Sequence, residues 1–241
     1  MGSVNISSQL KKLCGHTEID SIHYKTARER DEEKRISSRM FCRECSARME
    51  GWFKNPGDAE MDFSLEPIKG IGKQIPWATD LRNKQVKILG PVLMTAMSEA
   101  GRGDIAALGL YRALLVFFGI KEARFWIDNS KTPIGFWHFK SDAERLVRSD
   151  DDCTRDWRKK PVKLTGQESA YTVLSVYDAS LLNRIRSANP LTPTIEESPA
   201  APSPGNPFAH GSKEDLINCI VALMSADNAL DGVHSESTAS S

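Results

Sequence analysis

Apolar residues recur at helical spacing through the middle of the chain. Between residues 72 and 100 they fall every three or four positions, which predicts a helix. Pro76 stands near the start of this segment, where proline is tolerated, whereas Pro91 lies within it and is expected to kink the helix or split it in two. Asp104 precedes a nearly continuous apolar stretch, so we expect it to cap a helix over residues 105–118.

The segments on either side carry weaker patterns. Upstream, Thr17 and Asp20 have the spacing of a capping box, which predicts a highly charged helix to about Ser37, and a second helix is expected over residues 43–53. The downstream pattern predicts short helices over residues 121–129 and 141–148, a small hairpin around residues 132–139 and a strand-like segment over residues 171–177.

Four potential metal ligands stand in two short pairs. Cys14-Gly15-His16 is followed, after twenty-five residues, by Cys42-x-x-Cys45. Zinc favours four such soft or borderline ligands in a tetrahedron, and a tight turn between ligands often needs a backbone conformation that glycine adopts cheaply. The alternative is that Cys42 and Cys45 merely face inward on a helix, with the first pair in a loop. We favour Zn²⁺ held by all four side chains, because cysteines of a protein expected inside the cell are more often metal ligands than disulfides. Such a zinc ion would be structural, since four protein ligands leave no open position for a substrate.

Changes in composition divide the chain into five regions. Residues 187–211 hold six of the twelve prolines, a density that favours an extended linker. The expected order is a zinc-binding module at 1–56, a mainly helical domain at 57–186, the Pro-rich linker at 187–211, an amphipathic helix at 212–225 and a disordered tail at 226–241. The expected fold class is mainly α with minor β, a small zinc knuckle followed by a helical domain.

Charge and hydropathy indicate which classes of partner this protein is expected to bind. Residues 1–170 carry 29 Lys and Arg against 24 Asp and Glu, and residues 171–241 carry 3 against 8. The surplus in the first part is weak evidence for a nucleic-acid partner, whose binding normally depends on a strong basic patch. The longest apolar stretch, residues 105–120, is too short to span a bilayer, and residues 1–30 lack the apolar run of a secretory signal. We therefore expect a cytoplasmic protein with no membrane partner.

Several short motifs together resemble small uncharacterised proteins of bacterial plasmids and phages. Those proteins pair a Cys-x-His…Cys-x-x-Cys zinc knuckle with a KQIxWA…IR…WID segment. The corresponding pieces here are GKQIPWA at residues 72–78, Leu81-Arg82 and FWIDN at residues 125–129, so the resemblance covers about residues 13–130. Pro76 departs from the more helix-friendly residue expected at its place. The resemblance implies an accessory protein of a mobile genetic element in a bacterial host, and it brings no established biochemical activity with it.

Two further clusters are candidates for chemistry. Five aromatic side chains are interleaved with cations: Phe125, Trp126, Phe136, Trp137 and Phe139. They could form a stacking platform for single-stranded nucleic acid, but we favour a place in the core, shared by Trp77 and Trp126, because large aromatic side chains dominate core burial. An enzyme using Cys153 or the acidic run Asp150–Asp152 is the least favoured alternative, since consecutive carboxylates seldom converge on one ion and no base is identifiable.

The segment after the linker has the pattern of a short amphipathic helix. Its candidate partner-binding residues are Leu216, Ile217, Ile220 and Leu223. A helix this short is marginal alone, so we expect it to dock either on its own domain or on a partner, and both alternatives stay open.

The favoured hypothesis is a non-enzymatic zinc-binding accessory protein of a mobile genetic element. It would bind nucleic acid or a nucleic-acid-processing complex of the host. The alternative is a direct protein inhibitor of a host defence system. The candidate cations for nucleic acid are Lys11, Lys12, Lys25, Arg28, Arg35, Arg39 and Arg43.

Overall fold

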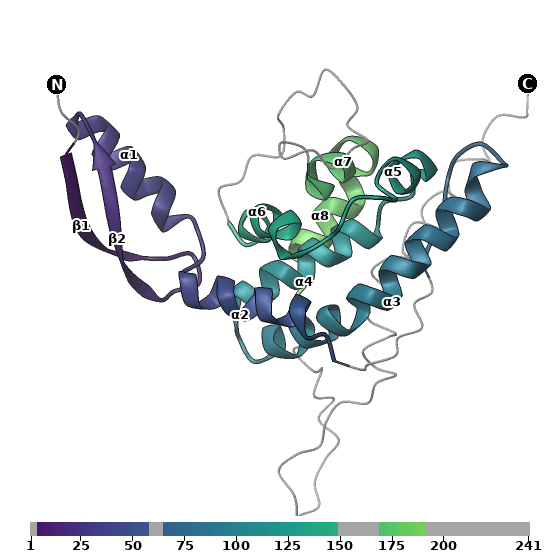
Figure 1. The fold of residues 1–241 in the computed structure, drawn as a ribbon, viewed down its shortest axis with the longest axis horizontal. Coiled ribbons are helices and arrows are strands. Elements are labelled where there is room, and N and C mark those ends of the chain that lie inside the picture. Colours follow the sequence, from purple (N-terminus) through teal and green to yellow (C-terminus); the bar gives the residue numbers. More distant parts are fainter. Residues whose placement is uncertain (1–3, 58–64, 149–168, 191–241) are drawn as a thin grey trace, which may run out of the picture.

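A helical body and a smaller projecting arm make up the part of the chain that the structure describes (Figure 1). This computed structural model describes residues 4–57, 65–148 and 169–190. Within them lie eight helices and one two-stranded antiparallel sheet. The expected fold class, mainly α with minor β, is confirmed.

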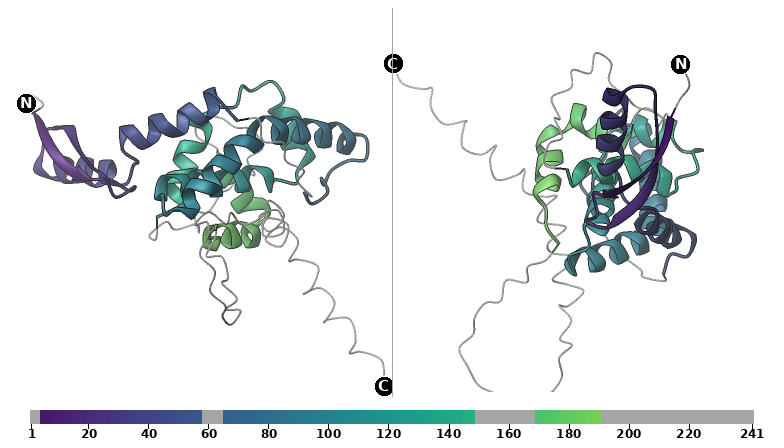
Figure 2. Two further views of the ribbon diagram at one scale, coloured as in Figure 1. Left: turned by 90° about the horizontal axis from the view of Figure 1, so that it is seen from below. Right: turned by 90° about the vertical axis from the view of Figure 1, so that its left-hand side faces the viewer.

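The arm, residues 4–40, consists of a β-hairpin and one helix. Strand β1 (Val4–Lys11) pairs antiparallel with β2 (Thr17–Tyr24), and helix α1 (Ala27–Ser38) packs on the hairpin. Two views at right angles show these three elements projecting together from one end of the body (Figures 1 and 2). Burial alternates along both strands, so that one face, which includes Ile22, turns toward α1 while the other is exposed.

The prediction of a helix from Thr17 to about Ser37 is wrong in its first part, which forms strand β2. The helix begins only after Thr26, whose hydroxyl accepts a hydrogen bond from the backbone N–H of Glu29 at 3.2 Å. The Thr17 and Asp20 pair mimics a capping box but lies within β2. The true cap has the same chemistry nine residues further along the chain.

The interior of the arm is small and largely polar. Ile22 is the only buried apolar side chain among residues 4–40, all of which the structure describes. Beside it, Lys12 Nζ forms an ion pair with Asp20 and donates a hydrogen bond to Ser37 Oγ at 2.7 Å. Apolar burial alone therefore contributes little to the stability of the arm.

The body is built around helix α4, against which α2, α3, α6, α7 and α8 all pack. Its helices are α2 (Arg43–Lys54), α3 (Gln74–Gly101), α4 (Ile105–Phe118), α5 (Ala123–Asp128), α6 (Phe136–Leu146), α7 (Ala170–Tyr177) and α8 (Ala179–Ser187). Helix α4 is buried along almost its whole length, and Asp104 caps it as expected. Helix α2, which is expected from the sequence to belong to the zinc module, contributes Cys45 and Met49 to the same core.

Helix α3 continues through Pro91 as one helix and is not split. Proline in a helix interior costs about 3 kcal/mol, because it removes a hydrogen bond and crowds the preceding turn. Here the residues around Pro91 are buried in the core, including Leu89 and Leu93. Burial of such side chains is worth about 1.5–3 kcal/mol each, which is enough to keep the helix continuous.

Two downstream predictions are wrong in type. The hairpin expected around residues 132–139 is replaced by the start of α6, and the strand-like segment at residues 171–177 is helix α7. Both helices pack against α4, so their apolar residues are buried against another helix rather than in a sheet. The expected helices at 121–129 and 141–148 correspond to α5 and to the last part of α6.

Some predictions fall outside the described residues. These are the acidic run Asp150–Asp152 and Cys153, most of the linker, the amphipathic helix at 212–225 and the tail at 226–241. Helix α8 ends at Ser187, the first residue of the expected linker.

Candidate metal centre

The first two candidate ligands lie in the turn that joins β1 to β2. The backbone N–H of Lys12 donates to the carbonyl of His16 at 2.8 Å, and the N–H of Gly15 donates to the carbonyl of Lys12 at 2.9 Å. Gly15 has a φ of 86°, a left-handed conformation that glycine adopts without steric cost. This tight turn presents Cys14 and His16 on the same side of the hairpin tip.

The other two ligands come from the first turn of α2. Cys42 is the N-cap residue, and its Sγ accepts a hydrogen bond from the backbone N–H of Cys45 at 3.3 Å. Unpaired N–H groups make the N-terminus of a helix the positive end of its dipole. The sulfur atoms of Cys42 and Cys45 therefore lie at the positive end of α2.

The four side chains converge on one point. One ligand atom from each of Cys14, His16, Cys42 and Cys45 lies within 4.8 Å of all the others. The Nδ1 atom of His16 is 3.5 Å from Cys42 Sγ and 3.2 Å from Cys45 Sγ. Among the described residues no other group of three or more Cys, His, Asp or Glu side chains is arranged in this way. The arrangement can hold a metal ion, as the sequence predicts for these four residues.

The thiols of the site differ in acidity. Burial and hydrogen bonding to Cys42, together with the neighbouring thiol groups, raise the pKa of Cys45 far above its ordinary value. Burial also acts to raise the pKa of Cys14, but hydrogen bonds from the backbone N–H groups of Cys42 and His16 outweigh it and lower that pKa. Several thiolates so close together repel one another, so their joint ionisation calls for a bound cation.

Arg48 links the metal centre to the start of α4. Its guanidinium is 4.0 Å from Cys45 Sγ and forms an ion pair with Asp104. The same Asp104 accepts hydrogen bonds from the backbone N–H groups of Ala106 and Ala107, both at 2.9 Å. A cation next to a ligand sulfur stabilises its thiolate, and such outer partners orient the ligands of metal sites.

The site lies at the junction of the arm and the body, which the sequence pattern does not reveal. Cys14 and His16 belong to the arm, whereas Cys42 and Cys45 belong to a helix of the body. Close to this junction, the backbone N–H of Phe41 donates to the buried carboxylate of Glu144 in α6 at 3.1 Å. A metal ion bound here would therefore join two parts of the molecule that share few other contacts.

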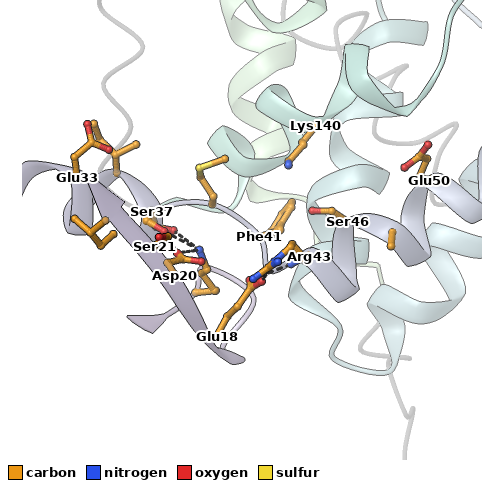
Figure 3. Close-up of a pocket in the computed structure, with 15 residues that line it drawn as sticks. Glu18, Asp20, Ser21, Glu33, Ser37, Phe41, Arg43, Ser46, Glu50 and Lys140 are labelled. Atoms are coloured by element: carbon orange, nitrogen blue, oxygen red, sulfur yellow. Dashed lines mark hydrogen bonds and ion pairs between the residues drawn. The ribbon is translucent and has the colours of Figure 1, made fainter. Parts of the chain in front are cut away.

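A cleft opens next to the junction, between β2 and α1 on one side and α2 and α6 on the other (Figure 3). Its volume is about 600 Å³. Arg43 at the start of α2 reaches across to Glu18 of β2, so the two walls are connected at one end by an ion pair. No motif predicts this cleft, because it forms between segments that are distant in sequence.

The seven candidate cations for nucleic acid are not equally available. Those with exposed side chains are Lys11, Lys25, Arg28, Arg35 and Arg43, and Arg39 is partly exposed. Lys12 is buried beneath its ion pair with Asp20 and therefore does not offer its ammonium group to a phosphate. Arg35 is paired with Glu32 and Arg43 with Glu18. The arm thus presents mixed charges rather than a basic patch.

Four of the five side chains of the aromatic cluster are buried in the core, as favoured from the sequence, and Trp137 is the exception. Phe125, Trp126 and Phe139 are buried and in ring contact with Phe117 of α4. Trp137 is 64% exposed and stacks on His138. Trp77 is 54% exposed, so the prediction that it shares the core with Trp126 is wrong. Most of these rings are therefore unavailable as a stacking platform.

No protein-family model, curated protein or solved structure matches the chain, so its function is inferred from its residues and their geometry. None of the helices in the described residues is both long enough and apolar enough to cross a bilayer.

Proposed function

We propose that this chain is a non-enzymatic, zinc-stabilised binding protein. The observation that carries the proposal is the convergence of three cysteines and one histidine from the hairpin tip and the start of α2. The N···S distances of 3.2 and 3.5 Å are similar to the edge of a zinc tetrahedron. Zn–S bonds of about 2.3 Å and Zn–N bonds of about 2.0 Å give an edge of roughly 3.5 Å. Three thiols and one imidazole are a ligand set typical of structural zinc.

The proposed role of the metal is to hold the arm against the body. Four protein ligands complete the tetrahedral coordination, so no position is left for a water molecule or a substrate. The positions of the ligands, two on each side of the junction, support this role. The enzyme alternative involves Cys153 and Asp150–Asp152, which lie outside the described residues.

We infer that the arm and the adjoining cleft contact a nucleic acid or a nucleic-acid-processing complex. The assignment to a mobile genetic element rests on the resemblance of the knuckle and the GKQIPWA and FWIDN segments. The ion pairs of Lys12, Arg35 and Arg43 favour a protein component over phosphate groups as the direct contact. The same observation supports the second candidate, a direct inhibitor of a host defence protein.

Elemental analysis of the full chain, purified under reducing and zinc-replete conditions, tests the proposal. We expect about one zinc ion per chain, and none in Cys42→Ser. Cys219→Ser makes the same chemical change at a cysteine that is not one of the four candidate ligands, and it should keep the metal. Absence of zinc from the unmodified chain would refute the proposal. Binding to single-stranded and duplex DNA as a function of salt then separates the partners, because phosphate contacts give a steep loss of affinity as salt rises.

A further inference from the structure

A continuous groove runs beside the junction. The cleft of about 600 Å³ and a second hollow of about 480 Å³ both include Ser46, Glu50 and Lys140 in their walls, so the two hollows adjoin and are treated together as one groove. It begins between β2 and α1 and passes over α2 to the exposed ring of Trp137. Each volume falls in the range of about 300–1,000 Å³ that is common for ligand sites.

One wall of the groove is the outer edge of β2. The cleft is lined by Glu18, Asp20, Ser21 and Ile22 of that strand. Glu18, Asp20 and Ile22 share the face that turns toward α1, whereas Ser21 lies on the opposite face, so the cleft follows the α1 face and reaches the edge of the strand at Ser21. The sheet has only two strands, so β2 has no partner on this side among the described residues.

Most backbone groups on this edge have no backbone partner among the described residues. The Lys12 N–H to His16 C=O hydrogen bond fixes the register, so that residues 18, 20, 22 and 24 point their backbone groups at β1. The N–H and C=O groups of Ile19, Ser21 and His23 therefore point outward. In the described part of the chain their N–H groups have no backbone partner, and the Ile19 carbonyl accepts only a long, 3.4 Å hydrogen bond from the Arg43 side chain.

We propose that this groove binds an extended peptide of a partner protein, which adds to β2 as a third strand. The inference rests on the proposed function and names the class of partner. A row of alternating N–H donors and C=O acceptors is complementary to another polypeptide backbone, whereas phosphate groups only accept. The groove also carries four acidic and four basic side chains, a balance that gives no net attraction to a nucleic acid.

The side chains of the groove indicate the sequence that such a peptide should have. Ile36 and Met40 line the cleft and are 44% and 37% exposed, so they can bury an apolar side chain of the peptide. Lys140 and Ser46 point into the gap between the arm and α2 (Figure 3). Among the described residues Lys140 forms no ion pair, and the shielded Ser46 hydroxyl has no hydrogen-bond partner there. The occupant should therefore carry an apolar residue close to a carboxylate.

A displayed library of random peptides of about twelve residues, selected on the full-length zinc-loaded chain, provides the probe. The most enriched peptide is then synthesised with a fluorophore, and its Kd is measured by anisotropy. Ser21→Pro removes an outward N–H while leaving the β1–β2 ladder intact, because edge strands tolerate proline where the N–H faces out. We expect it to weaken binding about tenfold, as loss of one hydrogen bond with added steric conflict implies.

Ser7→Pro is the matched control, because Ser7 is the register partner of Ser21 and its N–H faces the opposite edge of the sheet. Ser21→Ala keeps the N–H but removes the hydroxyl, which donates to the Asn5 side chain at 2.8 Å. Both variants should bind as the unmodified chain does, and Lys140→Glu should weaken binding of peptides with carboxylates. In the unmodified chain, peptide binding should slow amide exchange at Ile19, Ser21 and His23.

Other outcomes overturn the inference. Equal weakening by Ser7→Pro and Ser21→Pro, unchanged exchange along β2 or selection of no peptide would exclude addition at this edge. Displacement of the peptide by a single-stranded oligonucleotide would make the groove a nucleic-acid site, and a dimer that Ser21→Pro abolishes would make the occupant a second copy. Zinc content measured on the same samples separates these failures from failure of the metal proposal.

Discussion

Loss of the proposed zinc ion should unfold the arm and spare the body. The perturbation is Cys14→Ser, which removes a ligand on the arm side without changing any residue of the helical core. Within residues 4–40 the only buried apolar side chain is Ile22, whose burial is worth about 1.5–3 kcal/mol. Ordering each residue costs about 1–2 kcal/mol of conformational entropy, and each hydrogen bond returns only about 0.5–1.5 kcal/mol. Structural zinc supplies about 10–16 kcal/mol in small zinc-finger peptides, which makes it the largest single stabiliser available to the arm.

Segment-resolved amide hydrogen exchange is the appropriate assay. In zinc-free Cys14→Ser, amides of β1, β2 and α1 should exchange at the rates of an unfolded chain, whereas those of α4 should keep their protection. Cys219→Ser serves as the control for the chemical change. Cys45→Ser should behave differently, because that side chain is 2% exposed and a hydroxyl there also destabilises the body, by about 1–3 kcal/mol.

Two results would refute this reasoning. Persistent protection of the arm in protein shown to lack zinc would mean that the hairpin and α1 are stable by themselves. Loss of protection in α4 together with the arm would mean that the junction transmits unfolding, and that arm and body form one cooperative unit.

Three further predictions concern the body. A Cβ at Gly109 would lie 2.5 Å from a backbone oxygen of α6, so Gly109→Ala should lower the unfolding free energy by about 1–3 kcal/mol in urea titrations. Burial raises the pKa of Glu144 above its ordinary value of 4.5, so the folded chain holds this proton more tightly than the unfolded chain. Stability should therefore fall as the pH rises from about 4.5 through the raised pKa, and Glu144→Gln should remove that fall in a pH series of thermal melts. Trp126 is 3% exposed and its indole donates to the Ile120 carbonyl at 2.9 Å, so Trp126→Ala should lower the unfolding free energy by about 3–5 kcal/mol in urea titrations. Trp137→Ala, at a 64% exposed ring, should lower it by less than about 0.5 kcal/mol.

Interactions between residues close in sequence were sufficient to predict the helices with clear caps and the four candidate metal ligands. Asp104 caps α4 as its position before an apolar run predicts, and Gly15 has the positive φ expected between two ligands. These features depend on interactions between residues two to four positions apart, which the order of residues specifies directly.

Patterns that depend on distant partners were misleading. The hairpin of the arm carries few apolar residues, and the spacing of Thr17 and Asp20 imitates a helix start that in fact lies at Thr26. In the segment that forms α7, β-branched and aromatic residues favour a strand, yet packing against α4 selects a helix. Propensities differ by only about 1 kcal/mol, so burial against a neighbouring element decides the outcome.

The amino-acid sequence alone specified which residues can hold a metal ion. It also specified the alternation of apolar and polar positions along most helices, because side-chain chemistry and helical spacing are local properties. The tertiary structure decided where those features meet. It placed Cys14 and His16 in one part and Cys42 and Cys45 in another, left Trp77 outside the core, and opened a cleft between β2, α1 and α2. These outcomes follow from contacts between segments far apart in the chain, whose free energies depend on which faces are buried together.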